Sequence, residues 1–188
     1  VMTERAILAG WGCQGMMTLG KLLAWTLMQE GKEVTYFPSY GAEVRGGTAH
    51  CHVVLSDRPI HSPIVESADT LIVMNQPSYE RFRPSLRPGG LLVLNRSLIE
   101  VRSEEGVDLL AVPASEIADE LGNIRVANTV MLGAYNQVRG LTTAEKLQAA
   151  LDRQLSGSKA ALLDVNRRAL AQGAEFARTR HPNPSPAV

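Results

Sequence analysis

The sequence predicts an α/β protein: a three-layer, Rossmann-like open sheet that is mostly parallel, with helices on both faces and a helical C-terminal third. Short continuous runs of Val, Ile and Leu indicate parallel strands that are buried on both faces. These runs alternate with amphipathic stretches, which is the pattern of β-α-β units. The last third of the chain has amphipathic stretches without strand-like runs between them.

Each element is bounded by its own signals. Strands are expected at Arg5–Ala9, Glu33–Phe37, Ala49–Leu55, Thr70–Met74, Leu91–Asn95 and Leu109–Val112. Helices are expected at Gln14–Glu30, Ser78–Leu86, Ser115–Leu121, Val126–Arg139, Thr143–Leu155 and Ser158–Arg178. Gly31 ends the first helix, Ser115 is expected to cap the third helix, and Thr142 or Thr143 the fifth. The run AHCHVVLS alternates more than the others, so it is expected to be an edge or antiparallel strand.

Length and composition limit the classes of function. A chain of 188 residues suits one domain, expected over 1–178, and the Pro-rich end 179–188 is expected to be disordered. Nineteen basic residues balance nineteen acidic ones, so no overall field favours nucleic acid. No apolar stretch reaches the roughly 18 to 20 residues of a membrane span, and the first residues do not resemble a targeting signal. We therefore expect a cytoplasmic protein that binds neither nucleic acid nor membrane.

Thiols and imidazoles give no metal-binding pattern. Cys13 and Cys51 are the two cysteines, whereas an iron–sulfur cluster takes about four thiolates. His50 and His52 face the same side of a strand but lack a third ligand, and we expect them to be packed or at an interface. Cys13 is interpreted as a small buried residue rather than a reactive thiol, and Cys51 as core. The sequence thus predicts neither a metal site nor a catalytic residue.

Residues 10–15, GWGCQG, place Gly10, Gly12 and Gly15 between the first strand and the first helix. This spacing is typical of turns that hold phosphates, because the helix N-terminus offers unpaired N–H groups to an anion. An NAD site also needs an acidic residue at the end of the second strand, where 38–40 is Pro-Ser-Tyr. The turn alone therefore permits NAD or FAD, a packing role only, or another phosphate-bearing ligand, and the last is favoured.

A second glycine-rich segment, 40–47, follows the second strand. Its glycines, which permit close approach or positive φ, are Gly41, Gly46 and Gly47. Tyr40 adds an aromatic face, and Glu43 and Arg45 add opposite charges. Such a segment can hold a ligand or dock a partner, and the alternative is a solvated loop whose charges pair locally.

Together these segments resemble the gamma subunit of 2-oxoacid:ferredoxin oxidoreductases, in the pyruvate/ketoisovalerate oxidoreductase catalytic domain family. The resemblance is carried by GWGCQGMMTLGKLLA, by the stretch from YFPSYGAEVRGGTAHCHVVLS to NQPSYERF, by RPGGLLVLN and by NTVMLGAYNQVRG. It spans about 5–176. The combination of Gly-x-Gly-x-Gln-Gly with Ser-Tyr-Gly-x-Glu-x-Arg-Gly-Gly is highly specific. Cys13 departs from the pattern, since glycine is common there.

The resemblance implies oxidative decarboxylation of a 2-oxoacid to acyl-CoA, with 2-oxoglutarate as the first expectation. Pyruvate, 2-oxoisovalerate, indolepyruvate and phenylglyoxylate are the alternatives. It implies alpha and beta partner subunits that hold thiamine diphosphate and magnesium, a ferredoxin-like subunit with iron–sulfur clusters, and ferredoxin as acceptor. The gamma chain would supply a subunit interface and position coenzyme A. A stand-alone nucleotide-binding regulatory module is the competing class, and co-purification with the partner subunits separates the two.

The predicted coenzyme A site combines both glycine segments. Backbone N–H groups of 12–15 would bind a phosphate, and Arg45 would add charge-assisted contacts. Tyr40 and Glu43 would orient their loop, while Asn75, Gln76 and Asn95 at strand ends would contact the ligand or a partner, or else cap turns. The predicted site residues are Gly10, Gly12, Cys13, Gln14, Gly15, Tyr40, Glu43, Arg45, Gly46, Gly47 and Asn75.

Overall fold

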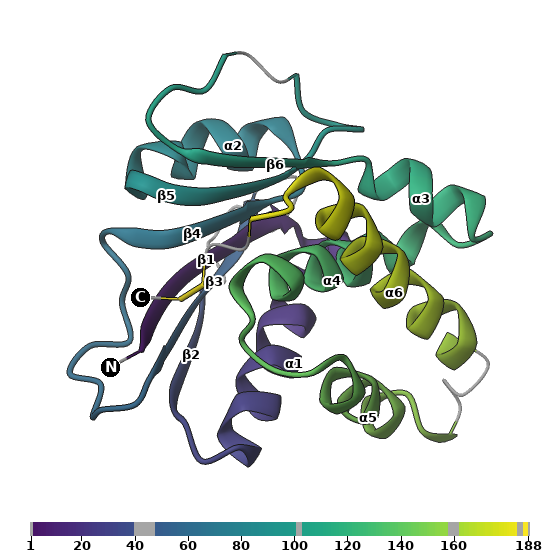
Figure 1. The fold of residues 1–188 in the computed structure, drawn as a ribbon, viewed down its shortest axis with the longest axis horizontal. Helices are drawn as coiled ribbons and strands as arrows, with labels where there is room; N and C mark the ends of the chain where they lie inside the picture. Colours follow the sequence, from purple (N-terminus) through teal and green to yellow (C-terminus); the bar gives the residue numbers. More distant parts are fainter. Residues whose placement is uncertain (1, 40–47, 101–102, 158–161, 184–185, 188) are drawn as a thin grey trace.

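One β-sheet of six strands organises residues 2–39, 48–100, 103–157, 162–183 and 186–187, which are those that the structure, a computed structural model, describes (Figure 1). The strands are β1 (Thr3–Trp11), β2 (Glu33–Ser39), β3 (Thr48–Ser56), β4 (Ala68–Val73), β5 (Leu86–Asn95) and β6 (Asp108–Val112). The α-helices are α1 (Met16–Gln29), α2 (Gln76–Phe82), α3 (Ala114–Glu120), α4 (Ala127–Arg139), α5 (Ala144–Gln154) and α6 (Leu163–Arg180). Short 3-10 helices are η1 (Gly12–Gln14), η2 (Arg83–Ser85) and η3 (Ile124–Val126).

The strand order is β2-β3-β1-β4-β5-β6, with parallel pairing from β1 to β6. Strand β3 is antiparallel to both of its neighbours, β1 and β2. The expectation of an edge or antiparallel strand is therefore met by the second alternative, since β3 is antiparallel and β2 lies outside it at the edge. Only 40–47 joins β2 to β3, and a connection of that length is too short for the crossover that a parallel pair requires.

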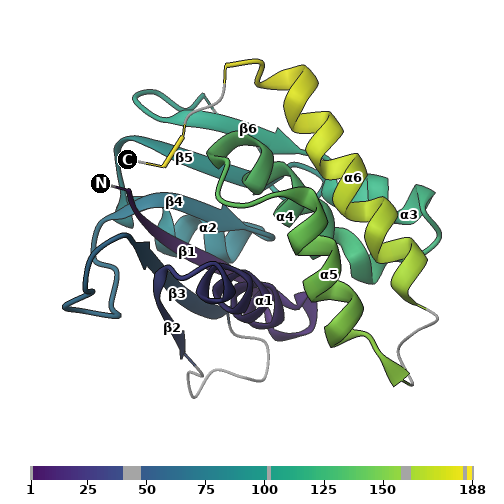
Figure 2. The ribbon, with the colours of Figure 1, turned by 60° about the horizontal axis from the view of Figure 1, so that its bottom comes forward.

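Helices cover the two faces of the sheet unequally. Side chains from α1 and α3–α6 form one large cluster with the alternate strand residues that include Leu8 and Val93. The opposite face, with Ile7 and Leu92, packs against Phe82 of α2. Figure 2 shows α1, α4, α5 and α6 on the near side of the sheet, with α2 behind it. This arrangement confirms the expected three-layer fold.

Two glycines allow helices α4 and α6 to approach closely. A Cβ added to Gly133 would lie 2.1 Å from the carbonyl oxygen of Leu170, and one added to Gly173 would lie 1.9 Å from that of Val130. Real Cβ atoms do not come this close to backbone, so the crossing requires glycine at both positions. This contact fixes α6 across the helical layer.

A polar network is buried at the amino ends of the parallel strands. The carboxylate Oε1 of Glu4 accepts hydrogen bonds from the hydroxyls of Thr70 and Tyr135, the latter at 2.9 Å. The Nε of Arg139 lies 3.3 Å from the same oxygen, and Arg139 also donates to the Asp69 carbonyl oxygen at 2.7 Å. Burial raises the pKa of Glu4, although Arg139 acts in the opposite direction. The network ties α4 to β1 and β4.

Two expected helix caps have different outcomes. Thr143 caps α5, since its side chain accepts a hydrogen bond from Lys146 N at 3.4 Å. Ser115 does not cap α3, which begins one residue earlier; its hydroxyl instead accepts a hydrogen bond from Asn95 Nδ2 at 2.9 Å. At the other end of the chain, α6 extends to Arg180, and His181 Nε2 lies 2.7 Å from Asp108 Oδ1. Disorder of the tail stays a prediction.

Candidate functional site

The candidate site lies where β1 passes into α1, at the carboxyl ends of the parallel strands. Strand β1 ends at Trp11, η1 follows, and Gly15 in the left-handed conformation (φ 71°) starts α1. Trp11 and the next two residues are exposed. Strand β3 begins opposite, because Trp11 and Thr48 are Cα partners in the β1–β3 ladder. The sheet thus brings Ser39 and Thr48, which flank the second glycine segment, to the edge that carries the turn.

The three glycines of the turn have three different surroundings. A Cβ on Gly10 would lie 2.8 Å from Gln14 Oε1 and 3.1 Å from Met74 Cβ, so Gly10 makes room for packing beneath the turn. Gly15 has positive φ, and a Cβ there would meet the Asn128 amide at 2.5 Å. Gly12 has neither constraint, because a Cβ there meets nothing within 4 Å. The fold therefore explains two of these glycines and leaves Gly12 at an open surface.

The underside of the turn is filled by the side chain of Gln14. Its Oε1 accepts hydrogen bonds from Trp11 N and from Asn75 Nδ2, each at 2.8 Å. Asn75 is buried and also accepts from Ser78 N at 2.9 Å, so it caps α2. The capping role predicted as an alternative for Asn75 is present in the structure, and its contact with a ligand stays a prediction.

The electrostatic character of the turn suits an anion. Helix α1 has 14 residues, and its first turn contains no acidic residue. The first N–H groups of a helix have no intrahelical acceptor and carry partial positive charge. A full cation is added nearby by Arg81, whose Nη1 donates to Thr48 Oγ1 at 2.9 Å. Phosphates and carboxylates are the ligands that such an arrangement favours.

Two residues of this region were missed by the sequence reasoning. Asn128 near the start of α4 donates from Nδ2 to the Gly15 carbonyl oxygen at 3.3 Å. Asn is common in the first turn of a helix, and its partner lies 113 residues away, so the sequence offered no signal for this contact. Arg81 lies on α2, 33 residues from Thr48, and no spacing in the sequence connects them.

The other predicted residues differ in their burial. Cys13 is exposed, so its interpretation as a small buried residue is wrong; η1 turns outward and leaves its side chain unpacked. Cys51 is buried as expected, and burial raises the pKa of its thiol to about 12. Asn95 is buried and bonded to Ser115, which fits turn capping. The predicted residues Tyr40, Glu43, Arg45, Gly46 and Gly47 lie outside the described residues.

The strand histidines belong to an aromatic cluster on the face covered by α2. The ring centroids of His50 and Phe82 are 4.6 Å apart, and those of His50 and His52 are 5.5 Å apart. His52 Nδ1 accepts from Val65 N at 2.9 Å. Burial first, then the charges of His52 and Arg81, lower the pKa of His50 to about 4. In the described part of the chain, no three or more His, Cys, Asp or Glu side chains are grouped to hold a metal ion.

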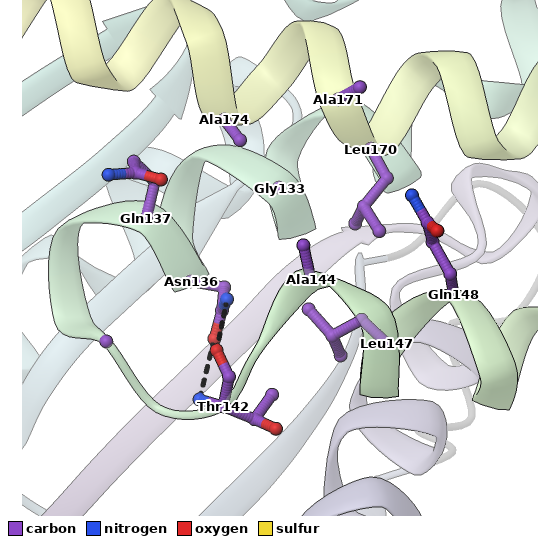
Figure 3. Close-up of a pocket in the computed structure, with 11 residues that line it drawn as sticks. Gly133, Asn136, Gln137, Thr142, Ala144, Leu147, Gln148, Leu170, Ala171 and Ala174 are labelled. Atoms are coloured by element: carbon purple, nitrogen blue, oxygen red, sulfur yellow. Dashed lines mark hydrogen bonds between the residues drawn. The ribbon is translucent and has the colours of Figure 1, made fainter.

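A separate hollow of about 250 Å³ lies between α4, α5 and α6 (Figure 3). Its lining contains no charged residue and none of the predicted site residues. Asn136 and Thr142 close one end, since the Asn136 amide donates to the Thr142 carbonyl oxygen and accepts from Thr142 N at 2.9 and 3.1 Å. The N-terminus of α5 borders it at Ala144, but the first turn of that helix carries Glu145 and no cationic side chain lines the hollow, so it does not favour a phosphate. None of the described helices is both long and apolar enough to span a bilayer.

The fold and the turn define a three-layer α/β domain whose first crossover can hold an anion. The model of the pyruvate ferredoxin/flavodoxin oxidoreductase family matches residues 5–176, so the chain belongs to that family. The family expected from the motifs is therefore confirmed.

The relatives of this chain differ in their length and in the 2-oxoacid that their names contain. Ketoisovalerate oxidoreductase subunit VorA of Methanothermobacter marburgensis is 38% identical over 93% of this chain, which spans only 36% of the VorA length. The 2-oxoglutarate synthase subunit KorC of Methanocaldococcus jannaschii is 31% identical, over 94% of this chain and 95% of its own. The chain thus corresponds to about a third of one relative and to nearly all of the other.

Solved structures share the fold. The gamma subunit of a keto/oxoacid ferredoxin oxidoreductase from Geobacter sulfurreducens superposes with a TM-score of 0.80 at 26% identity, over 94% of this chain and 99% of that one. The 2-oxoglutarate:ferredoxin oxidoreductase from Magnetococcus marinus, solved with 2-oxoglutarate, coenzyme A and succinyl-CoA bound, gives 0.90 at 23% identity, over 100% of this chain and 33% of that one. The second likeness concerns the fold alone.

Proposed function

We propose that this chain is the gamma-type component of a 2-oxoacid:ferredoxin oxidoreductase and that its glycine turn binds the phosphate-bearing part of coenzyme A. Family membership supports the first part. The second part is supported by the anion-binding character of the turn and by the coenzyme A present in the Magnetococcus marinus enzyme. The decarboxylation chemistry, with thiamine diphosphate, magnesium and iron–sulfur clusters, is assigned to alpha, beta and ferredoxin-like partner subunits, and ferredoxin is the electron acceptor.

The surroundings of Gly12 carry the proposal. Nothing inside the described fold requires glycine there, since a Cβ would enter open space. A glycine that the fold does not need is explained if another molecule approaches the backbone closely from outside. The exposed amides of the turn at the N-terminus of α1 would then donate to phosphate oxygens.

The second glycine segment completes the proposed site. Ser39 and Thr48 bring its two ends to the edge that carries the turn. We assign Arg45 to a charge-assisted contact with a coenzyme A phosphate, because a guanidinium can donate two parallel hydrogen bonds to it. Tyr40 and Glu43 are assigned to the subunit interface. Gly46 and Gly47 would allow the backbone to approach the ligand.

The oxoacid is proposed as 2-oxoglutarate, with 2-oxoisovalerate as the second candidate. KorC is named as a 2-oxoglutarate synthase subunit, and the match with this chain covers 95% of its length. VorA, at the higher identity of 38%, carries a ketoisovalerate name and favours the second candidate. Turnover of the assembled complex on each oxoacid, at equal coenzyme A concentration, distinguishes them.

The test of the coenzyme A assignment is Gly12→Val in the assembled complex. The melting temperature of the variant should equal that of the wild type, because the new side chain points into open space. Its KM and Kd for coenzyme A should rise about tenfold or more, which corresponds to the loss of one or two charge-assisted hydrogen bonds. Pantetheine, which lacks the phosphates, is the control ligand and should be used equally well by both proteins. Unchanged coenzyme A binding in Gly12→Val would falsify the assignment.

A further inference from the structure

The side-chain amide of Gln14 has an orientation that its partners determine. The same atom lies 2.8 Å from Trp11 N and 2.8 Å from Asn75 Nδ2. The backbone N–H of Trp11 can only donate, so the atom that faces it must be the amide oxygen. The usual ambiguity between the oxygen and the nitrogen of a glutamine amide therefore does not arise here.

This orientation leaves the amide nitrogen of Gln14 pointing away from both partners. Within the described stretches of the chain, Nε2 has no acceptor, and the side chain is half-buried rather than sealed in the core. Two N–H groups of this amide are thus left for an acceptor from outside the described residues. Their direction is fixed because the oxygen of the same planar amide is held by two donors.

The partners of Gln14 also make it a mechanical link. Trp11 belongs to the end of β1, and Asn75 is a buried residue that caps α2. Gly10 leaves the space that the amide occupies, since a Cβ there would lie 2.8 Å from Gln14 Oε1. One side chain therefore sets the position of the turn relative to the neighbouring β4–α2 connection.

We infer that Gln14 is a positioning residue with a second, direct role: its oxygen holds the turn in place while its Nε2 donates to a phosphate oxygen of the bound ligand. This inference rests on the proposed coenzyme A site. An uncharged donor in this position recognises an acceptor oxygen and rejects a donor group. A substitution that preserves only one of the two roles should therefore distinguish the positioning of the turn from the donation to the ligand.

Gln14→Glu preserves the first role and reverses the second. A carboxylate oxygen can accept from Trp11 N and Asn75 Nδ2 as the amide oxygen does, but its other oxygen presents negative charge where Nε2 donated. We expect the wild-type unfolding temperature within about 2 °C and at least a tenfold rise in the Kd and KM for coenzyme A, with kcat little changed. Gln14→Met, which removes both roles, should lower the unfolding temperature and also weaken binding. Gln137→Glu, an exposed residue of α4, is the matched charge control and should bind normally.

If Gln14→Glu does not fold, NMR spectroscopy provides a second test of the donor role of Gln14. In the ¹⁵N-labelled full chain, the Gln14 side-chain NH₂ signals, assigned by their loss in Gln14→Met, should shift when coenzyme A is added. The donor role alone is overturned if a stably folded Gln14→Glu binds coenzyme A with the wild-type Kd. It is also overturned if coenzyme A shifts the Gly12 backbone signal and leaves the Gln14 side-chain signals unmoved. Wild-type Kd in Gly12→Val overturns the coenzyme A site itself and this inference with it.

Discussion

Arg139 Nε lies 3.3 Å from Glu4 Oε1, and both side chains are almost completely buried. This ion pair joins the last turn of α4 to the start of β1, with the hydroxyls of Thr70 and Tyr135 on the same carboxylate oxygen. Breaking a buried pair by removing one partner leaves a charge without compensation in the interior.

Arg139→Met is therefore expected to lower the free energy of unfolding by about 3–5 kcal/mol. Glu4→Gln combined with Arg139→Met removes both charges and should recover part of that loss. Urea denaturation of the wild type and the two variants measures the difference. A double variant no more stable than Arg139→Met alone would contradict the assigned cause.

Gly173→Ala tests the crossing of α4 and α6. The added methyl would lie 1.9 Å from the Val130 carbonyl oxygen, so the helices must separate. Overpacking of this kind costs about 1–3 kcal/mol, and thermal unfolding should show a clear fall in melting temperature. Gly12→Ala makes the same chemical change where space is open and should leave the melting temperature unchanged. Equal effects of the two substitutions would refute the packing explanation.

His50 should contribute a loss of stability of the folded chain as the pH falls from about 6.5 to 4. His50 has a pKa lowered from 6.5 to about 4 in the folded state, chiefly because of burial. The unfolded chain therefore takes up a proton in this range that the folded chain refuses, so protonation favours unfolding. The pKa of His52 is shifted in the same direction.

His50→Phe provides the measurement of that effect. A phenyl ring can occupy the place beside Phe82 without titrating. The slope of unfolding free energy against pH between 6.5 and 4, from urea titrations, should be smaller in the variant than in the wild type. An identical slope would assign the acid sensitivity to other groups.

The two cysteines should react at very different rates. Cys13 is exposed, whereas Cys51 has no exposed surface and a thiol pKa raised to about 12. Native protein treated with a maleimide is expected to gain one adduct by mass spectrometry, and denatured protein two. Cys13→Ser should remain unlabelled until it is denatured. Labelling of native Cys13→Ser would mean that Cys51 is reached without unfolding.

The strands and helices were predictable because each has its own apolar period. All six expected strands are found in the described chain; their ends agree within two residues except for the start of β5, which lies at Leu86 rather than Leu91. The residue pattern limited β3 to an edge or antiparallel strand, but it did not predict that β2 would lie outside β3. The pairing of β2 with β3 depends on the short connection between them and not on the residue pattern. The Ser115 cap failed because the hydroxyl has a better partner in Asn95, 20 residues away.

The site was predictable only where the sequence is locally unusual. The glycine spacing identified the turn, but it could not show that Gly10, Gly12 and Gly15 are there for different reasons. The neighbours of Gly10 are Gln14 and Met74 and that of Gly15 is Asn128, whereas a Cβ on Gly12 meets nothing, and these differences exist only in the folded chain. Cys13 was expected to be a small buried residue rather than a reactive thiol, but none of the three residues of η1 is buried. Arg81 gave no signal because its contact with Thr48 depends on how α2 lies on the sheet.

The contact between Asn128 and Gly15 has a consequence for how the protein is made. The turn is synthesised first, and the amide that holds its last carbonyl oxygen follows 113 residues later. Until α4 emerges and packs, a nascent chain has the glycines without the side chain that steadies the start of α1. A chain that stops short of residue 128 therefore contains the whole GWGCQG signature and lacks this support for it.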